Sequence, residues 1–403
     1  MRIPKFKKPA IKIKYNKKIL ILILISLSTL SLLVFVGFTY QKSQKLNIQI
    51  ESIENEKSQL TKSYEESQKR INEMEHEDQR KKNKELEDEI ESIRKAYKNA
   101  VLVYESLLDL KAISKNTSKF DDQLAEIFTL LSNQEYQKAN DQITQLSHDI
   151  KAETDKISSA FTIPENLPVE NTPPSSGYRR QSVQVDAGTF MVDIVSGDLG
   201  STKVIVDTAS TSDCANACPV LPLADYISRN GAYAGVNGTY FCPATYPTCA
   251  GKTNSFDLLV MNKDKTYFNS GNNVYSTNPG VIFGDGYIRF VSAISQWGRD
   301  TGPNGVLSNY PLLVFNSNIS FGGDDDPKKG SKGARSFVAN KGNTVFIGVV
   351  HNATVAESAR VMKALGMENA LNLDDGGSTA LWSGGYKVGP GRNLPNVILF
   401  IRK

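Results

Sequence analysis

The sequence has 403 residues, with 47 lysines and arginines against 43 aspartates and glutamates, and a formal net charge of +4. A chain of this length exceeds one ordinary domain, so we expect several segments. A nearly balanced charge excludes the overall basic character of a nucleic-acid-binding protein, and we predict no nucleic-acid partner.

The N-terminus is basic and is followed by an uncharged apolar run. Residues 1–18 contain eight lysines and arginines and no acidic residue, and residues 19–38 carry no charge. A run of about twenty apolar residues is long enough to span a bilayer, and basic flanks stay in the cytoplasm. We therefore predict a cytoplasmic tail at 1–18, a transmembrane signal anchor at 19–38 and a single-pass cell-membrane protein whose remainder lies outside. A cleaved signal peptide and a buried core helix are the alternatives.

Residues 41–160 show helical periodicity and predict an α-helical coiled-coil stalk. The first seam contains Ile50, Ile53, Leu60, Tyr64, Ile71 and Met74, and the second contains Leu86, Ile90, Ile93, Tyr97, Ala100, Tyr104 and Leu107. A break near Ser132 and Asn133 favours a helical hairpin in the later part. Because polar residues interrupt the first seam, we expect a stalk that self-associates weakly or folds back on itself. A spacer that holds the next domain off the membrane is favoured over a partner-binding stalk.

Proline and small residues dominate 161–177 and predict a linker. Its prolines are Pro164, Pro168, Pro173 and Pro174. We expect this segment to contribute little to any core.

All four cysteines lie in the part that we place outside the membrane, at Cys214, Cys218, Cys242 and Cys249. An even number in an oxidising compartment predicts two disulfides. The short spacings favour local pairing, although three connectivities are open. A zinc site is a weaker alternative, because neither spacing has the two-residue gap of a zinc knuckle.

From residue 178 the pattern changes to short alternating apolar runs, as in half-buried strands. These runs lie at 183–185, 190–194, 204–206, 258–260, 281–283 and 313–315. We therefore predict a mixed α/β (α+β) domain over 178–403, preceded by the transmembrane helix and the stalk.

The clearest local unit lies in the second half of this domain. It consists of a strand at 335–339, a turn at 340–343, a strand at 344–350, a helix from Thr354 to Gly366 and a strand at 370–373. Thr354 and Glu357 have the spacing of a capping box, and glycine commonly ends a helix. Strand, helix and strand with short connections predict a right-handed crossover.

Two adjacent carboxylates, Asp374 and Asp375, follow the last of these strands. Open α/β sheets bind ligands at the C-terminal ends of their strands, so adjacent acids there are candidates for catalysis. Gly376 and Gly377 would let the backbone approach a substrate closely. The alternative is that one aspartate only caps the turn before Gly376.

These residues also form part of a longer motif. The stretch 372–379, Asn-Leu-Asp-Asp-Gly-Gly-Ser-Thr, resembles the Asn-Leu-Asp-Gly-Gly-Gly-Ser-Thr signature of the phosphodiester glycosidase family. Further matches lie in family order at 235–241, 310–314, 333–336 and 392–396. The resemblance extends from about residue 181 to 403. The family includes the enzyme that uncovers mannose 6-phosphate and bacterial exopolysaccharide-associated proteins. Asp375 is a departure, since the family has glycine there.

The resemblance implies hydrolysis of the bond between a sugar's anomeric carbon and a phosphodiester. The departing phosphate needs charge compensation, which arginine supplies bidentately, and this makes Arg335 and Arg392 the candidates. An oxocarbenium-like transition state needs a carboxylate, for which Asp374 is the first choice and Asp375 the second. The alternative for either arginine is a structural ion pair.

Other motif positions would contact the substrate. They are Asn237, Gly238, Gly376, Gly377, Ser378, Thr379 and Asn396. Asn237 is also suited to a structural turn. His351 could act as an acid or base, although a hydrogen-bonding histidine at a sheet edge is the commoner case. The run 324–326 predicts a solvated turn rather than a calcium loop.

Three functions remain open from the sequence. The favoured one is an extracytoplasmic hydrolase acting on phosphodiester-linked glycan in cell-surface metabolism. A non-catalytic surface module that binds phosphate-bearing glycan is the alternative, and a structural domain that caps the stalk is the weakest. The sequence indicates no cofactor and no metal ligand set, and it leaves a divalent metal open.

Overall fold

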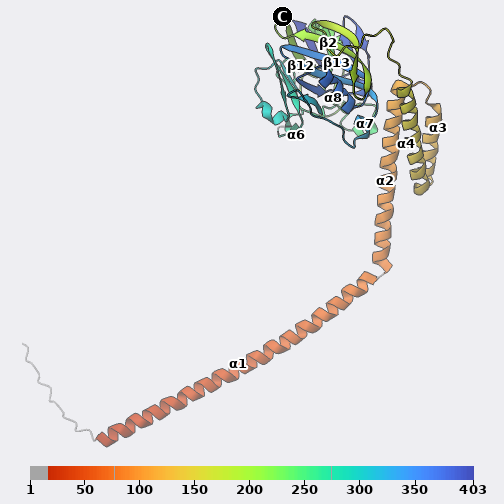
Figure 1. Cartoon of the computed structure of the whole chain (residues 1–403). Coiled ribbons are helices and arrows are strands. Elements are labelled where there is room, and N and C mark those ends of the chain that lie inside the picture. The colour runs from red at the N-terminus through yellow and green to blue at the C-terminus, as the bar shows by residue number, and fades with distance from the viewer. Residues whose placement is uncertain (1–16, 77, 274) are drawn as a thin grey trace, which may run out of the picture. The chain divides into compact units, whose positions relative to one another are not determined.

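The computed structural model describes residues 17–76, 78–273 and 275–403 (Figure 1). It divides into two units, one that ends at Glu91 and one from Ser92 to Lys403. The first unit consists of helix α1 (Lys17–His76) and the start of α2 (Asp78–Ile113).

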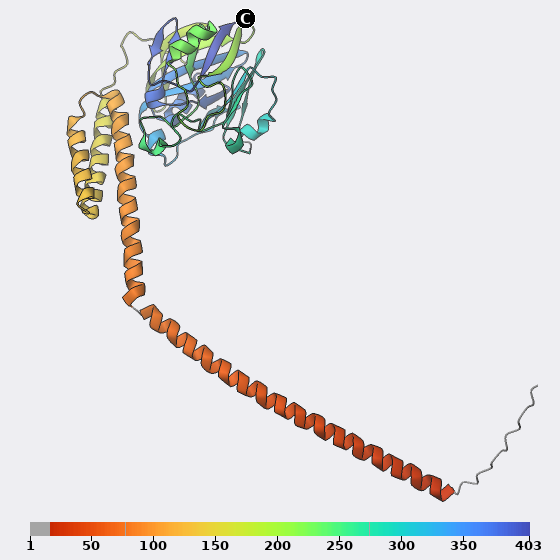
Figure 2. The same cartoon turned by 180° about the vertical axis from the view of Figure 1, so that it is seen from behind.

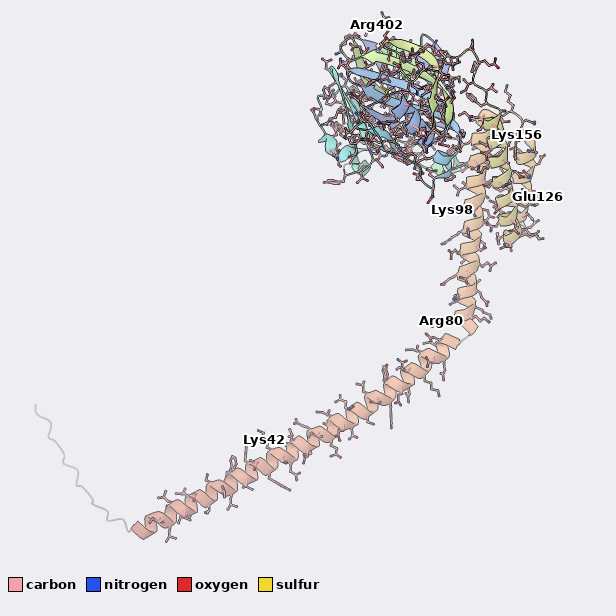
Figure 3. All side chains as sticks on the ribbon, viewed as in Figure 1. Lys42, Arg80, Lys98, Glu126, Lys156 and Arg402 are labelled. Carbon is pink, nitrogen blue, oxygen red and sulfur yellow. A yellow bond between two sulfur atoms is a disulfide. The ribbon has the colours of Figure 1, made fainter. Side chains whose placement is uncertain are left out.

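The apolar part of α1 is exposed to its surroundings. Every residue from Ile21 to Phe38 is exposed, and Leu33 is 69% accessible. Among the described residues, Ile21–Glu75 is the one helix that is long and apolar enough to cross a membrane. Figure 3 shows side chains standing out from α1 on all sides, Lys42 among them. An exposed apolar helix of this kind, together with disulfides further on, suggests a secretory or membrane route.

The residues of the first predicted seam are all exposed on α1. Ile50 and Met74 mark its two ends, and Leu60 is exposed between them. The seam therefore has no partner within the described part of the chain, and self-association stays a prediction.

The end of α2 packs with α3 (Ser118–Ser132) and α4 (Tyr136–Ser159) in a three-helix bundle (Figures 1 and 2). The predicted hairpin break is confirmed, since α3 ends at Ser132. The predicted second seam is confirmed only in part, because Ala100 and Leu107 are buried whereas Leu86, Ile90 and Tyr97 are exposed. Two helices pack against α2 at once, and this requires a different face from a two-stranded seam. The buried residues of α2 are Ala96, Ala100, Val103, Leu107 and Leu110.

The proline-rich segment lies along the first strand of the next domain. Glu170 N donates to Ser182 O at 2.8 Å, and Ser182 N donates to Pro168 O at 3.0 Å. Pro173 and Pro174 are buried. The segment is thus tied to the sheet edge by its backbone at Pro168 and Glu170, and two of its prolines are buried.

The domain that follows the bundle is built around three antiparallel sheets. The seven-stranded sheet has the order β1 (Gly177–Val185), β2 (Gly188–Asp198), β13 (Thr344–Ala353), β12 (Gly333–Lys341), β14 (Asn369–Asn372), β10 (Leu312–Phe315) and β11 (Asn318–Ile319). One five-stranded sheet has the order β16 (Tyr386–Val388), β15 (Leu381–Ser383), β4 (Ala234–Asn237), β17 (Asn396–Arg402) and β3 (Thr202–Thr208). The other has the order β6 (Tyr267–Phe268), β5 (Val260–Met261), β9 (Gly305–Ser308), β7 (Gly280–Gly284) and β8 (Tyr287–Val291).

The helical elements of this domain are short. They are α5 (Leu223–Asn230), α6 (Ser270–Asn273), α7 (Pro327–Gly330) and α8 (Val355–Ala364), with 3-10 turns at η1 (Pro247–Cys249), η2 (Ile294–Trp297) and η3 (Gly376–Ser378). The predicted mixed class is therefore confirmed only in part. The chain has long N-terminal helices, and its C-terminal domain is β-rich.

A shared core holds the three sheets together. Val195, Val236, Val281 and Leu371 belong to one buried cluster, although they come from all three sheets. A second cluster lies under α8, where Val355, Ala359 and Met362 pack on the seven-stranded sheet. The central strands of the seven-stranded sheet are thus buried on both faces, one against the shared core and the other under α8.

The strand–helix–strand unit is present, but its sheet is not an open α/β sheet. β13 and β14 each pair antiparallel with β12, so they run parallel to each other on its two sides. The strand pairs described within the sheets are all antiparallel, so the carboxylates do not lie at the strand ends of an open α/β sheet. This pairing determines what lies beside the two carboxylates. In an antiparallel pair, the end of β14 lies beside the beginning of β12.

The predicted hairpin is confirmed with a shorter turn. Lys341 pairs with Thr344, so the turn contains only Gly342 and Asn343. Gly342 has a φ of +54°, as two-residue hairpin turns require. The capping box of Thr354 and Glu357 is also present at the start of α8.

The four cysteines pair locally, as their spacing favours. The structure contains the disulfides Cys214–Cys218 and Cys242–Cys249. These thiols are consequently not zinc ligands. Among the described residues, no group of three or more histidines, cysteines, aspartates and glutamates could hold a metal ion.

Candidate functional site

The two aspartates lie where the ends of three strands meet. Asp374 N donates to Gly238 O at 2.9 Å, and Asn237 Nδ2 donates to the main-chain oxygen of Asp374 at 2.7 Å. These bonds tie the segment after β14 to the end of β4. The Asn237 carboxamide oxygen also accepts from Ser336 Oγ at 2.8 Å, which brings in β12. Asn237 is therefore fully engaged in joining the strand ends.

Asp375 is held by a dense set of hydrogen bonds. Its Oδ1 accepts from Ser336 N at 3.0 Å, and its Oδ2 accepts from Asn372 Nδ2 at 2.9 Å and Arg335 Nη1 at 3.2 Å. The side chains of Asp375 and Arg335 are only 10% and 7% exposed. Burial raises the pKa of Asp375, and the Arg335 charge opposes that rise. Asp375 and Arg335 thus form a buried ion pair.

Arg335 makes further bonds that fix the loop before β12. Its Nε donates to Ala353 O at 2.9 Å, and its Nη2 donates to Lys328 O at 2.9 Å and to Ser331 O. With these carbonyls and Asp375 as partners, its guanidinium is committed to the fold. Arg335 therefore has the environment of a structural ion pair, which was one of the two interpretations from sequence.

Asp374 is less fully bonded than its neighbour. Its Oδ1 accepts from Asp375 N at 3.0 Å. Burial raises the pKa of Asp374 to about 7, and the Asp375 charge adds to the rise, while the Ser378 hydroxyl and the Arg392 charge oppose it. The Ser378 oxygen is buried and has no hydrogen bond of ordinary length among the described residues. Asp374 is thus a carboxyl that changes charge near neutral pH.

Arg392 approaches the turn that carries the aspartates. A Cβ at Gly377 would lie 2.5 Å from Arg392 Nη2, so a larger residue would displace the guanidinium. Arg392 N also donates to Gly377 O at 2.8 Å. The Arg392 side chain is 25% exposed, and its charge lowers the pKa of Asp374. Of the two predicted arginines, Arg392 is the one that a ligand can reach.

A second close approach explains why residue 238 is a glycine. A Cβ there would lie 1.8 Å from Asn396 Oδ1. That oxygen accepts from Thr239 N at 3.0 Å, so Asn396 joins the end of β4 to the start of β17. The other predicted turn residues lie nearby. Gly376 is exposed with a φ of +58°, and the Thr379 hydroxyl donates to Ala334 O at 3.4 Å.

The sequence interpretation missed the aromatic residues around the carboxylates. Tyr240 OH accepts from Asn372 Nδ2 at 2.9 Å. Burial and then the charges of Asp375 and Asp374 raise the pKa of Tyr240 well above its usual value. The Tyr310 ring lies edge-on to Tyr240, with centroids 5.1 Å apart. Both tyrosines belong to quoted motifs, at 235–241 and 310–314, so their place in these motifs was the available signal.

Two other predicted features lie away from the carboxylates. His351 Nε2 is 2.7 Å from Asp193 Oδ2, in a buried network with Arg180 and Tyr178. This is a structural role, near the end of the inner strand β13. Asp326 caps α7 by accepting from Lys328 N, which is consistent with a turn rather than a calcium loop.

The region that contains the candidate site also matches a known protein family. Residues 230–401 match a family model described as phosphodiester glycosidase. No curated protein matches the chain.

Three solved structures are similar to part of this chain. A hypothetical protein from Synechocystis is 15% identical, with a TM-score of 0.42, and the match covers 56% of this chain and 62% of that chain. The zebrafish N-acetylglucosamine-1-phosphodiester alpha-N-acetylglucosaminidase catalytic domain, auto-inhibited by its pro-peptide, is 16% identical, with a TM-score of 0.44 and coverage of 59% and 87%. A putative exported protein from Burkholderia pseudomallei is 11% identical, with a TM-score of 0.35 and coverage of 53% and 74%. The chain thus spans less than two thirds of the Synechocystis protein's length. Residues 230–401 are thus similar to the phosphodiester glycosidase family.

Proposed function

We propose that this protein is a membrane-anchored, extracytoplasmic hydrolase that cleaves the bond between a sugar's anomeric carbon and a phosphodiester in cell-surface glycan. The observation that carries the proposal is that the partly exposed guanidinium of Arg392 lies against Gly377, in the turn that follows Asp374, and that its charge acts on the Asp374 carboxyl. The match of residues 230–401 to a phosphodiester glycosidase family model supports the same reaction class.

The proposed reaction needs opposite charges on the two sides of the anomeric carbon. On one side, the Asp374 carboxylate attacks that carbon or takes a proton from the attacking water. On the other side, the bond between the carbon and the phosphate oxygen breaks, and its electron pair stays on the phosphate. Arg392 stabilises that charge through parallel N–H bonds to phosphate oxygens. Tyr240 and Tyr310 offer ring surfaces against which a sugar could pack.

The test of this function is a hydrolysis assay on the full chain in detergent. We would incubate it with a panel of sugar-1-phosphodiesters and measure free reducing sugar and phosphomonoester. Release of both products in equal amounts supports the proposal. Binding of these compounds without any turnover would instead identify the non-catalytic glycan-binding module.

Arg392→Ala should weaken binding and slow the reaction together. A guanidinium that bonds an anion contributes about 1.5–3 kcal/mol, so we expect kcat/KM to fall about 10- to 100-fold, with a higher KM. Arg360→Ala is the matched control, because Arg360 is an exposed arginine of α8 paired with Asp186 at 3.1 Å. Steady-state kinetics on both variants would check this. A loss confined to kcat would show that Arg392 does not bind the ground state.

The reaction should have an ascending pH limb near neutrality. The pKa of Asp374 is raised to about 7, so below this pH its carboxyl is protonated and cannot act as base or nucleophile. We therefore expect kcat/KM to rise as the pH increases through about 7. Since the Asp375 charge contributes to the rise in pKa, Asp375→Asn should move the limb to lower pH. A limb near pH 4 in the unaltered protein would contradict the assignment of Asp374.

A further inference from the structure

Helix α2 contacts the domain that contains the candidate site. Glu105, on α2, is only 5% exposed. Its Oε1 accepts from Thr248 N at 3.0 Å and from Thr248 Oγ1 at 2.5 Å. Thr248 lies in the loop that the Cys242–Cys249 disulfide closes. The buried carboxylate therefore anchors α2 on a loop whose ends are covalently fixed.

One helical turn later, Asp109 lies among positively charged groups. Tyr246, in the same disulfide-closed loop, donates its hydroxyl hydrogen to Asp109 Oδ1. Lys328 Nζ is 3.8 Å from Asp109 Oδ2, and Arg392 Nη2 is 4.0 Å from Asp109 Oδ1. Both cations also lie over the Tyr246 ring, at 4.8 Å for Lys328 and 5.4 Å for Arg392. A single carboxylate thus faces a guanidinium, an ammonium and a phenol hydroxyl.

This set of donors is suited to a phosphate group. A guanidinium fork and an ammonium that converge on one point are the groups that bind phosphate oxygens in proteins. Asp109 holds them only loosely, since its side chain is 39% exposed and both ion-pair distances are near 4 Å. Ion pairs of this kind contribute little free energy. A phosphate that approached Arg392 would also be repelled by the Asp109 carboxylate at short range.

We propose that Asp109 of α2 competes with phosphate for Arg392 and Lys328, so that docking of the helical bundle and binding of a phosphodiester oppose each other. The ligand class is a phosphate mono- or diester, and the competing element is a segment of the predicted stalk. The proposal rests on the proposed function in one respect, that Arg392 is the phosphate ligand. Under it, the stalk regulates the site as well as holding it off the membrane.

Binding of inorganic phosphate to the full chain in detergent tests this without any need for hydrolysis. We would compare Asp109→Asn with the unaltered protein by the phosphate-dependent rise in thermal unfolding temperature. Asp109→Asn should tighten phosphate binding about two- to fivefold, the range that one weak, half-exposed ion pair gives. Asp155→Asn is the control, because it removes one negative charge from an exposed pair with Lys151 on α4.

A second pair of variants tests docking separately from charge at the anion site. Glu105→Ala removes the acceptor for both Thr248 donors and should release α2, so phosphate binding should tighten although Asp109 is intact. Glu105→Gln keeps an acceptor oxygen and should bind phosphate as the unaltered protein does. Helical content measured by circular dichroism would confirm that the bundle remains folded in both.

The outcomes separate this proposal from the proposed function. Unchanged phosphate affinity in both Asp109→Asn and Glu105→Ala overturns the competition. Lower turnover in Asp109→Asn without tighter binding also overturns it, because Asp109 would then position Arg392. If phosphate binds more tightly to both variants but no sugar-1-phosphodiester is hydrolysed, the competition stands and the proposed hydrolase activity fails. Arg392→Ala should abolish phosphate binding in every background.

Discussion

Asp374→Asn is expected to lower kcat by about 10²- to 10⁴-fold, the range for loss of a positioned acid–base group. The asparagine keeps the size of the side chain and can still accept from Asp375 N, which now bonds Asp374 Oδ1 at 3.0 Å. It cannot carry the negative charge that the anomeric carbon requires in the transition state. Substrate affinity should therefore change little, because the loss is confined to an interaction made during the reaction.

The same variant should be more stable than the unaltered protein above neutral pH. The pKa of Asp374 is raised in the folded chain, so ionisation of this carboxyl opposes folding between its ordinary value of 3.8 and about 7. In that interval the folded state holds the proton and the unfolded state does not, and stability falls as the pH rises. Asparagine does not titrate and removes this cost.

Denaturant unfolding at pH 5 and pH 8, together with steady-state kinetics, would check both effects. Asp300→Asn is a suitable control, since Asp300 lies in a surface turn and its Oδ1 accepts from Gly302 N. Retention of full turnover by Asp374→Asn would exclude Asp374 as the reacting carboxylate. Loss of turnover with a large loss of stability would instead assign it a structural role.

Local patterns predicted much of what surrounds the site. The capping box of Thr354 and Glu357 depends on neighbouring residues only, and the structure contains it. The pairing of Cys242 with Cys249 is likewise local. The carboxylates after β14 were identified because a short strand followed by two acids and two glycines is readable within one stretch of sequence.

Properties that depend on strand pairing could not be read from the same patterns. The role of Arg335 follows from the antiparallel register in which Phe337 faces Asn372, which places the start of β12 beside Asp375. Periodicity does not reveal whether strands on either side of a third strand pair antiparallel with it. The contact between Asp109 and Arg392 joins residues 283 positions apart, counted from 109 to 392, and nothing local to either residue indicates it.

Asp375→Gly, which restores the residue common in the family, should mainly reduce stability rather than activity. Both Asp375 oxygens are occupied by Ser336, Asn372 and Arg335, so its carboxylate has no oxygen free of protein donors for substrate chemistry. Its removal leaves the charge of Arg335 buried without a counter-charge. Breaking a buried pair from one side costs about 3–5 kcal/mol.

The partner variant decides whether this cost comes from Arg335. Arg335→Met combined with Asp375→Gly removes both charges, so the double variant should unfold with a smaller loss than the sum of the two single losses. Urea unfolding of the four proteins gives that coupling, and the hydrolysis assay run beside it gives the activity. If Asp375→Gly keeps its stability and loses turnover while Asp374→Asn stays active, Asp375 is the reacting carboxylate. In that case the departure from the family pattern would lie in the chemistry, and not in the ion pair that holds the strand ends together.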